Sequence, residues 1–153
     1  MHRTTALWHM FLILASALLL AGCGDSTTGG ASTLNVGTPG DQLAFDPATL
    51  RATANAQITV TFKNNASTLQ HNWVLAKGGD DVVAKVATEG NAAGQTKGYI
   101  PDDTANIIAH TKLLDAGQSD SVTFTAPAPG TYTYLCSVPG HYQAGMKGTL
   151  TTQ

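Results

Sequence analysis

The sequence predicts an all-β protein folded as a β-sandwich. Two segments, 57–63 and 121–125, alternate apolar and polar residues with a period of two, which indicates strands buried on one face. A series of short strand-like segments, separated by turns at close intervals, is typical of a sandwich. Charged residues make up only 12% of the chain, against the roughly 25% of an average soluble protein. Thr, Ser, Asn and Gln supply much of the polar surface instead, which suits a β-rich fold.

The other strands are expected, in chain order, in segments bounded by Gly, Pro, Asn and Asp: 34–37, 42–45, 50–52, 71–75, 107–114, 130–135 and 147–152. Between two of these strands the pattern changes. Val82, Val83 and Val86 have helical spacing and Asp80 could cap a helix, so a short helical excursion is expected around residues 80–88. The Gly/Ala-rich stretch 89–98 is expected to be irregular. The length of 153 residues suits one domain, here residues 34–153, without internal repeats.

The first 22 residues have the features of an export signal. His2 and Arg3 form a short positive start, an apolar run follows from 11 to 20, and Leu20-Ala21-Gly22-Cys23 ends it. This ending resembles the bacterial lipobox, in which the cysteine becomes the lipidated first residue of the mature protein. The alternative, an uncleaved membrane anchor, is disfavoured because a span needs about 20 apolar residues. We therefore expect residues 1–22 to be a lipoprotein signal peptide. Residues 23–33 would be a flexible Gly/Ser/Thr-rich tether from lipidated Cys23, which holds the domain on the extracytoplasmic (periplasmic) side of a membrane.

Removal of the signal leaves few soft or nitrogen donors in the chain. Met146 is then the single methionine, and the histidines are His71, His110 and His141. Because Cys23 would carry the lipid, Cys136 alone keeps a free thiol, and no disulfide is expected. The single methionine and the free cysteine stand in the same short segment, which points to a shared role.

That segment, 136–146, predicts a copper site. It places Cys136, His141 and Met146 five residues apart each time, between two expected strands. Thiolate and thioether are soft ligands that select copper, and two histidines, one cysteine and a weak axial methionine form the electron-transfer copper site. The second histidine must come from elsewhere. His71, which starts a strand after a turn, is the best candidate, whereas mid-strand His110 is more simply a structural histidine.

Other functions are weaker interpretations of the same residues. A net charge of −2 with no basic patch gives no indication of nucleic-acid binding. Asp102 and Asp103 follow a proline and are more simply a solvated turn than paired catalytic carboxylates. A Cys/His hydrolase would need an orienting residue and an oxyanion element, and neither is evident. A structural zinc site stays open, because zinc accepts the same ligands.

Several longer motifs resemble azurin, namely 71–75 (HNWVL), 108–113 (IAHTKL), 120–124 (DSVTF), 139–141 (PGH) and 146–150 (MKGTL). The domain from about residue 34 onward is even more similar to the auracyanins, azurin-like blue copper proteins of filamentous anoxygenic phototrophic bacteria. The start 37–41 (GTPGD), the run 45–50 (FDPATL) and the four-residue gap between His141 and Met146 carry this closer resemblance. The resemblance implies a Greek-key, cupredoxin-like β-sandwich.

It also implies a set of site residues. One copper ion that alternates between Cu(I) and Cu(II) would be bound by His71, Cys136, His141 and Met146. Asn72 matches the asparagine that ties the two ligand-bearing loops together. Gln70 matches the residue whose carbonyl makes a distant axial contact in azurin. Electrons would be exchanged through the exposed edge of His141, with an apolar docking surface formed around it by Val138, Pro139, Tyr142 and Ala144.

The expected function is that of a membrane-tethered one-electron carrier without substrate turnover, serving respiratory or photosynthetic complexes. Three histidines are too few for a multicopper oxidase. By the same resemblance, the donor would be a membrane quinol-oxidising complex and the acceptor a photosynthetic reaction centre or its cytochrome. The alternative is an extracytoplasmic copper-binding scavenger or chaperone with the same ligands.

Overall fold

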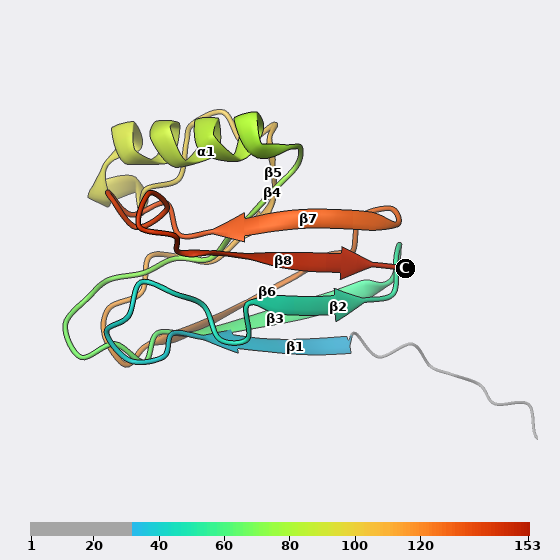
Figure 1. The fold of residues 1–153 in the computed structure, drawn as a ribbon, viewed down its shortest axis with the longest axis horizontal. Helices are drawn as coiled ribbons and strands as arrows, with labels where there is room; N and C mark the ends of the chain where they lie inside the picture. Colours follow the sequence, from blue (N-terminus) through green and yellow to red (C-terminus); the bar gives the residue numbers. More distant parts are fainter. Residues whose placement is uncertain (1–31) are drawn as a thin grey trace, which may run out of the picture.

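The computed structural model describes residues 32–153 and confirms the predicted all-β fold (Figure 1). A three-stranded sheet, in the order β1-β3-β6, packs against a five-stranded sheet, in the order β2-β8-β7-β4-β5, as a Greek-key β-sandwich. The strands are β1 (Ser32–Gly37), β2 (Thr49–Ala52), β3 (Gln57–Lys63), β4 (Val74–Ala76), β5 (Ile107–His110), β6 (Ser119–Thr125), β7 (Gly130–Leu135) and β8 (Lys147–Thr152). The expected signal peptide and Cys23 lie outside the described residues.

Two predictions near the start of the domain were wrong. β1 begins at Ser32, so the last two residues of the expected 23–33 tether belong to a strand that pairs in parallel with β3. The expected strand 42–45 does not form. Phe45 is instead buried in the core, and Asp46 alone pairs, in an isolated bridge to Gly37.

The strands around His71 are shorter than the sequence suggested. β4 starts at Val74 rather than at His71, and β5 ends at His110 rather than at 114. The regular ladder is interrupted because the backbone N–H of Trp73 donates to the side-chain oxygen of Thr111 (3.0 Å). His71 forms an isolated bridge with Leu114, with N–O distances of 3.1 and 2.8 Å. The backbone of His71 is therefore hydrogen-bonded although it lies outside a regular strand.

The helical excursion is longer than expected. Helix α1 spans Asp80–Ala93 and the short 3-10 helix η1 spans Gln95–Lys97, so the prediction that 89–98 is irregular was wrong. The residues that α1 buries have helical spacing to its end: Val83, Val86, Ala87 and Gly90. Asp80 does not cap the helix. The N-cap is Gly79, and Asp80 lies in the first turn, where its charge complements the positive end of the helix.

Side chains are buried on both faces of the five-stranded sheet. Leu75, Tyr134 and Cys136 face the main core between the two sheets. Val74 and Leu135, their neighbours in sequence, face a smaller core beneath α1. This alternation is the period-two pattern of a strand covered on both sides. It makes the strand end that carries Cys136 one of the most enclosed parts of the fold.

The two ends of the sandwich differ in what they carry. Leu135 pairs with Lys147 at one end of the β7–β8 hairpin, and Gly130 pairs with Thr152 at the other. The 136–146 loop lies beyond the first end, which we call the loop pole. Ser32 and the C-terminus lie at the other end, the terminal pole (Figure 1). Within residues 32–153, no helix has the length and apolar character of a membrane span.

Candidate metal centre

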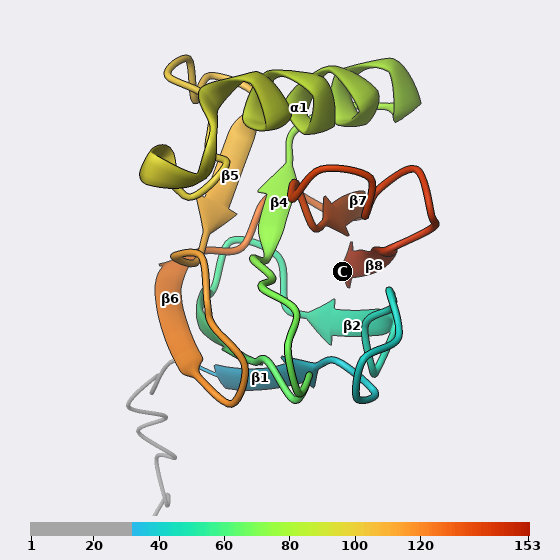
Figure 2. The same ribbon diagram turned by 90° about the vertical axis from the view of Figure 1, so that its left-hand side faces the viewer.

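The loop between β7 and β8 folds back on itself, so that its ends meet. The N–H of Cys136 donates to the carbonyl of Met146 (3.2 Å), and the N–H of Met146 donates to the carbonyl of His141 (2.9 Å). A further bond, from the N–H of Ala144 to the carbonyl of Gly140 (2.9 Å), tightens the turn between them. Viewed onto the loop pole, this loop lies between α1 and strand β2 (Figure 2). The backbone thus holds the three loop residues expected to bind metal next to one another.

His71 joins this group from a different segment of the chain. Its Nδ1 lies 3.8 Å from the sulfur of Cys136, and Nδ1 of His141 lies 3.4 Å from the same sulfur. The ligand atoms of these three residues are all within 4.8 Å of one another. Cys136, His71 and Met146 are fully buried, and His141 keeps 9% of its surface exposed.

These separations fit a metal ion. Metal–nitrogen and metal–sulfur bonds of about 2.0–2.3 Å to three donors in one plane separate the donors by about 3.5–4 Å. The two sulfur–nitrogen distances, 3.8 and 3.4 Å, lie within this range and just below it. The donor set of one thiol, two imidazoles and a neighbouring thioether is the one that suits copper. The residues present therefore fit a single copper ion held by His71, Cys136 and His141, with Met146 beside them.

Burial prepares the two imidazoles for metal binding. Desolvation lowers the pKa of His71 to about 4, with a further contribution from the neighbouring His141 and an opposing one from Asp41. Desolvation also lowers the pKa of His141. Both rings are therefore neutral near pH 7, which is the state that donates a lone pair to a metal.

The same burial acts against the thiolate form of Cys136. Without a metal ion, desolvation raises the pKa of this thiol to about 11, although hydrogen bonds from Asn72 and Val138 oppose the rise. A bound cation reverses this preference, because its own charge stabilises the thiolate. The thiol is thus protonated near pH 7 in the metal-free protein, and it becomes a thiolate ligand together with the ion.

Asn72 connects the two ligand-bearing segments. Its side-chain oxygen accepts a bond from the N–H of Ser137 (2.9 Å), and its side-chain nitrogen donates to the Ser137 hydroxyl (2.8 Å) and to the carbonyl of Gly98 (2.8 Å). Asn72 directly follows His71 and Ser137 directly follows Cys136. These bonds fix the position of one ligand relative to the other.

A further contact extends this network to helix α1. The Ser137 hydroxyl donates to the carbonyl of Tyr99 (2.7 Å). A Cβ atom added to Gly90 of the helix would lie 2.9 Å from the Cβ of Ser137 and 2.5 Å from the Tyr99 carbonyl oxygen. The sequence did not indicate Ser137, Tyr99 or Gly90 as site residues. Tyr99 contributes a backbone carbonyl, which any residue could supply, and Gly90 contributes only the absence of a side chain. Only the change of pattern after residue 78 hinted that a helix packs here.

His110 lies outside the cluster of ligand atoms, and the side chain of Gln70 bonds to other residues. The Gln70 side chain donates to Asp115 (2.6 Å) and accepts from Gln95 (2.8 Å), which holds the residue before His71 from outside. His110 is exposed at the end of β5, and its Nδ1 lies 3.1 Å from the carbonyl of Thr111. Asp102 is an exposed partner of Lys97 (2.6 Å), which fits a solvated turn.

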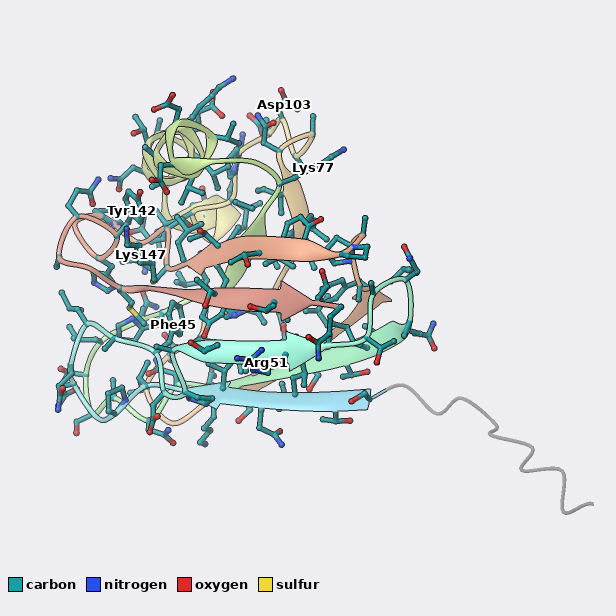
Figure 3. All side chains as sticks on the ribbon, turned by 45° about the vertical axis from the view of Figure 1, so that its right-hand side comes forward. Phe45, Arg51, Lys77, Asp103, Tyr142 and Lys147 are labelled. Atoms are coloured by element: carbon teal, nitrogen blue, oxygen red, sulfur yellow. The ribbon has the colours of Figure 1, made fainter. Side chains whose placement is uncertain are left out.

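The residues expected to surround His141 are at the loop pole. Pro139 and Ala144 are exposed, and Val138 and Tyr142 are half-buried. The ammonium of Lys147 lies 5.7 Å from the centre of the Tyr142 ring, and Figure 3 shows the two side chains next to each other at this pole. The surface beside the histidine edge is therefore mostly apolar, with one cation at its border.

Known proteins share this chain's sequence and fold. Auracyanin-A of Chloroflexus aurantiacus is 42% identical over 160 residues, which cover 98% of each chain. Auracyanin-B of the same organism is 50% identical over 79% of this chain and 52% of its own length. A crystal structure of dithionite-reduced auracyanin from the photosynthetic bacterium Roseiflexus castenholzii superimposes with a TM-score of 0.77 at 49% identity, covering 81% of this chain and 99% of that one.

The model of the copper-binding proteins of the plastocyanin/azurin family matches residues 32–153, the whole of the described domain. The match contains all four residues whose donors were predicted from the loop spacing and from His71. On this match, and on the identity to the auracyanins over nearly the full chain, the protein belongs to the plastocyanin/azurin family of blue copper proteins.

Proposed function

We propose that this protein is a one-electron carrier with a type 1 copper site formed by His71, Cys136, His141 and Met146. The observation that carries the proposal is the convergence of two buried imidazole nitrogens on one buried thiol, at 3.4 and 3.8 Å. Bound copper would supply the exchange of one electron between its Cu(I) and Cu(II) states. The electron-transfer role of the plastocyanin/azurin family supports the same function.

The protein's contribution is to keep the ligands still. Electron transfer is fast when the site changes little between oxidation states, and ligands fixed by packing and hydrogen bonds change little. The bonds of Asn72 to Ser137 support its assignment as the tie between the two ligand segments. For Gln70 we propose a weak axial contact of its carbonyl. Its side-chain bonds to Asp115 and Gln95 support this role, because they hold that residue in place.

We further propose that partners dock on the apolar surface made by Val138, Pro139, Tyr142 and Ala144. His141, 9% exposed, is the metal-binding histidine that reaches this surface. An apolar surface excludes water around the exposed ring edge and lets partners approach closely without specific charge pairing. The carrier would thus exchange electrons through His141 and turn over no substrate.

The proposed location is the extracytoplasmic side of a membrane, with the domain anchored by a lipid on Cys23. The lipobox-like sequence 20–23 supports this location. By family analogy, the proposed electron donor is a membrane quinol-oxidising complex. The similarity to an auracyanin from a photosynthetic bacterium supports a photosynthetic reaction centre or its cytochrome as the proposed acceptor.

A visible spectrum and a voltammogram of the purified protein test the function. A strong thiolate-to-Cu(II) charge-transfer band that is lost on reduction, together with a reversible one-electron wave, is the expected result. A colourless protein that binds zinc more tightly than copper would contradict it. Ready transfer of copper to a chelating acceptor, with slow electron self-exchange, would favour a scavenger or chaperone instead.

A charge placed on the docking surface tests the route of electron exchange. Ala144→Glu should leave the spectrum unchanged but slow electron transfer with isolated membranes. Thr53→Glu, an exposed position at the terminal pole, is the matched control. Equal rates for the two variants would remove the proposed docking surface.

A further inference from the structure

We propose that the lipid anchor keeps the metal-binding end of the domain off the bilayer surface. The redox partners must then carry their docking surfaces on domains that project from the membrane. The inference rests on the proposed lipidation of Cys23 and adds the geometry that this anchor imposes.

The chain enters the domain at the pole opposite the metal centre. Ser32 starts β1 and pairs with Ile58, near the beginning of β3. At the same pole, the N–H of Ala54 donates to the carbonyl of Gln153 (2.9 Å). The loop that carries Cys136 and His141 lies beyond the far ends of β7 and β8 (Figure 1). An anchor that leads into Ser32 therefore pulls on the terminal pole.

The dimensions of the domain set the height of Ser32 when the loop pole faces the membrane. A compact domain of roughly 120 residues has a radius of gyration of about 14 Å and is therefore about 35 Å across. If the docking surface around His141 lay on the lipid headgroups, Ser32 would stand about 35 Å above them.

The anchor segment is too short for that orientation. Nine residue steps separate Cys23 from Ser32. A fully extended chain of nine residues reaches at most about 30–32 Å, and a Gly/Ser-rich linker of this length spans about 17 Å on average. The domain can stand upright or lie on its side, but it cannot place its loop pole flat on the bilayer that holds its lipid.

This limit defines the kind of partner. At its average span of about 17 Å the anchor holds Ser32 about that far above the headgroups, and the exposed edge of His141, at the far pole of a domain about 35 Å across, is then about 18 Å above them. A partner whose electron-exchanging group lies level with the headgroups is met only when the anchor is almost fully extended, which is a rare state of a Gly/Ser-rich linker. A partner with a peripheral domain that stands above the membrane meets the docking surface directly.

Energy transfer to the bilayer tests the orientation with the full lipidated protein in vesicles. One donor dye is attached at Thr53→Cys, in the turn at the terminal pole, or at Gln143→Cys, in the loop at the other pole. Both positions are exposed. The vesicles carry an acceptor dye on their headgroups, and the metal centre is kept reduced so that it does not absorb the donor's emission. Transfer from position 53 should exceed transfer from position 143 by about twofold or more, given the difference in reach.

A lengthened anchor tests whether the length of the anchor sets the orientation of the domain. Insertion of Gly/Ser repeats that triple the distance from Cys23 to Ser32 gives a reach of about 90 Å, so the difference between the two positions should then shrink. Equal or stronger transfer from position 143 with the native anchor would overturn the orientation while leaving the anchor in place. Absence of transfer from both positions would reject the anchor itself, and the inference with it.

Discussion

Cys136 is fully buried, and its backbone N–H donates to the carbonyl of Met146 (3.2 Å). Its sulfur faces two imidazole nitrogens rather than apolar side chains alone. A small buried cysteine in an ordinary core would be replaceable by serine at modest cost to stability. Here the same change removes the one donor that both histidines face.

Cys136→Ser should therefore abolish the blue colour, because no thiolate remains to transfer charge to Cu(II). His110→Ala is the matched control, since His110 is exposed and stands outside the ligand cluster. Visible absorption of the copper-loaded variants measures the effect. A blue serine variant would refute the ligand assignment, and a colourless His110 variant would show that the wrong histidine was chosen.

Met146→Leu tests the axial position. The variant should keep its colour, because the thiolate remains, and its reduction potential should rise, because a donor that favours Cu(II) is replaced by an apolar side chain of similar volume. Voltammetry beside the wild-type protein gives the shift. A lower potential would contradict the axial role of this thioether.

The metal-free protein should lose stability as the pH falls from about 6.5 to about 4. The pKa of His71 is lowered to about 4 in the fold by desolvation and by His141. Between these values the unfolded chain binds a proton that the folded chain does not, so acidification favours unfolding. Denaturant titrations across this range measure the trend, and His71→Gln should weaken it. Greater stability on acidification of the metal-free wild type would contradict the assignment.

At the residue scale, the sequence was most informative where chemistry restricts the residue type. The spacing of Cys136, His141 and Met146 identified the loop before any contact was known, and His71 was identified by its place after a turn. The residues that hold these ligands in place were harder to predict from the sequence. Asn72 was expected only through a family resemblance, and the acceptor of the Ser137 hydroxyl is a backbone carbonyl, which any residue could supply.

At the element scale, helix α1 is part of the site although it carries no ligand. Gly90 lets the helix approach Ser137 so closely that no side chain fits between them. The sequence predicted only the first part of this helix. Glycine is a poor helix former, so the stretch that follows Thr88 looked irregular, and burial against the sheet reverses that local preference.

Gly90→Ala should disturb the metal site, although residue 90 is not one of the proposed ligands. The added Cβ would meet the carbonyl oxygen of Tyr99 at 2.5 Å and Ser137 at 2.9 Å, and overpacking of this kind costs about 1–3 kcal/mol. Because Ser137 follows Cys136, the charge-transfer band and the potential should both shift.

Val86→Ala is the control for stability alone. Val86 is buried on the same helix, and this truncation should cost about 2 kcal/mol. It touches the smaller core rather than Ser137, so its spectrum should match the wild type. An unchanged spectrum and potential in the Gly90 variant would show that the helix only stabilises the fold.

At the scale of the whole molecule, the period-two pattern was enough to predict a sandwich, whereas strand ends and register were not predictable. The reason is that some side chains form contacts in place of the backbone bonds of a regular sheet. The side-chain oxygen of Thr111, rather than a strand carbonyl, accepts the bond from the N–H of Trp73. Phe45 is buried in the core, and its segment forms no strand. Such exchanges depend on residues distant in sequence, and they shape the loop pole more than the terminal pole.

The metal ion should stabilise the loop pole of the whole domain. His71 precedes β4, and Cys136 and His141 belong to the β7–β8 loop, so a common ion cross-links two segments 65 residues apart. A ligand at about 1,000 times its dissociation constant adds about 4 kcal/mol to the free energy of unfolding. Copper loading should accordingly raise the Tm of the wild type by several degrees but leave that of Cys136→Ser nearly unchanged.

Hydrogen exchange locates this effect. Amides that open locally at the loop pole, such as those of Asn72 and Ser137, should exchange more slowly with copper bound. The amides of the turn around Asn55, at the terminal pole, should exchange at the same rate with and without metal, because local opening of this turn does not disturb the site. Equal protection of both poles would mean that the ion stabilises the fold only globally, and that the apo loop is already as rigid as the electron carrier requires.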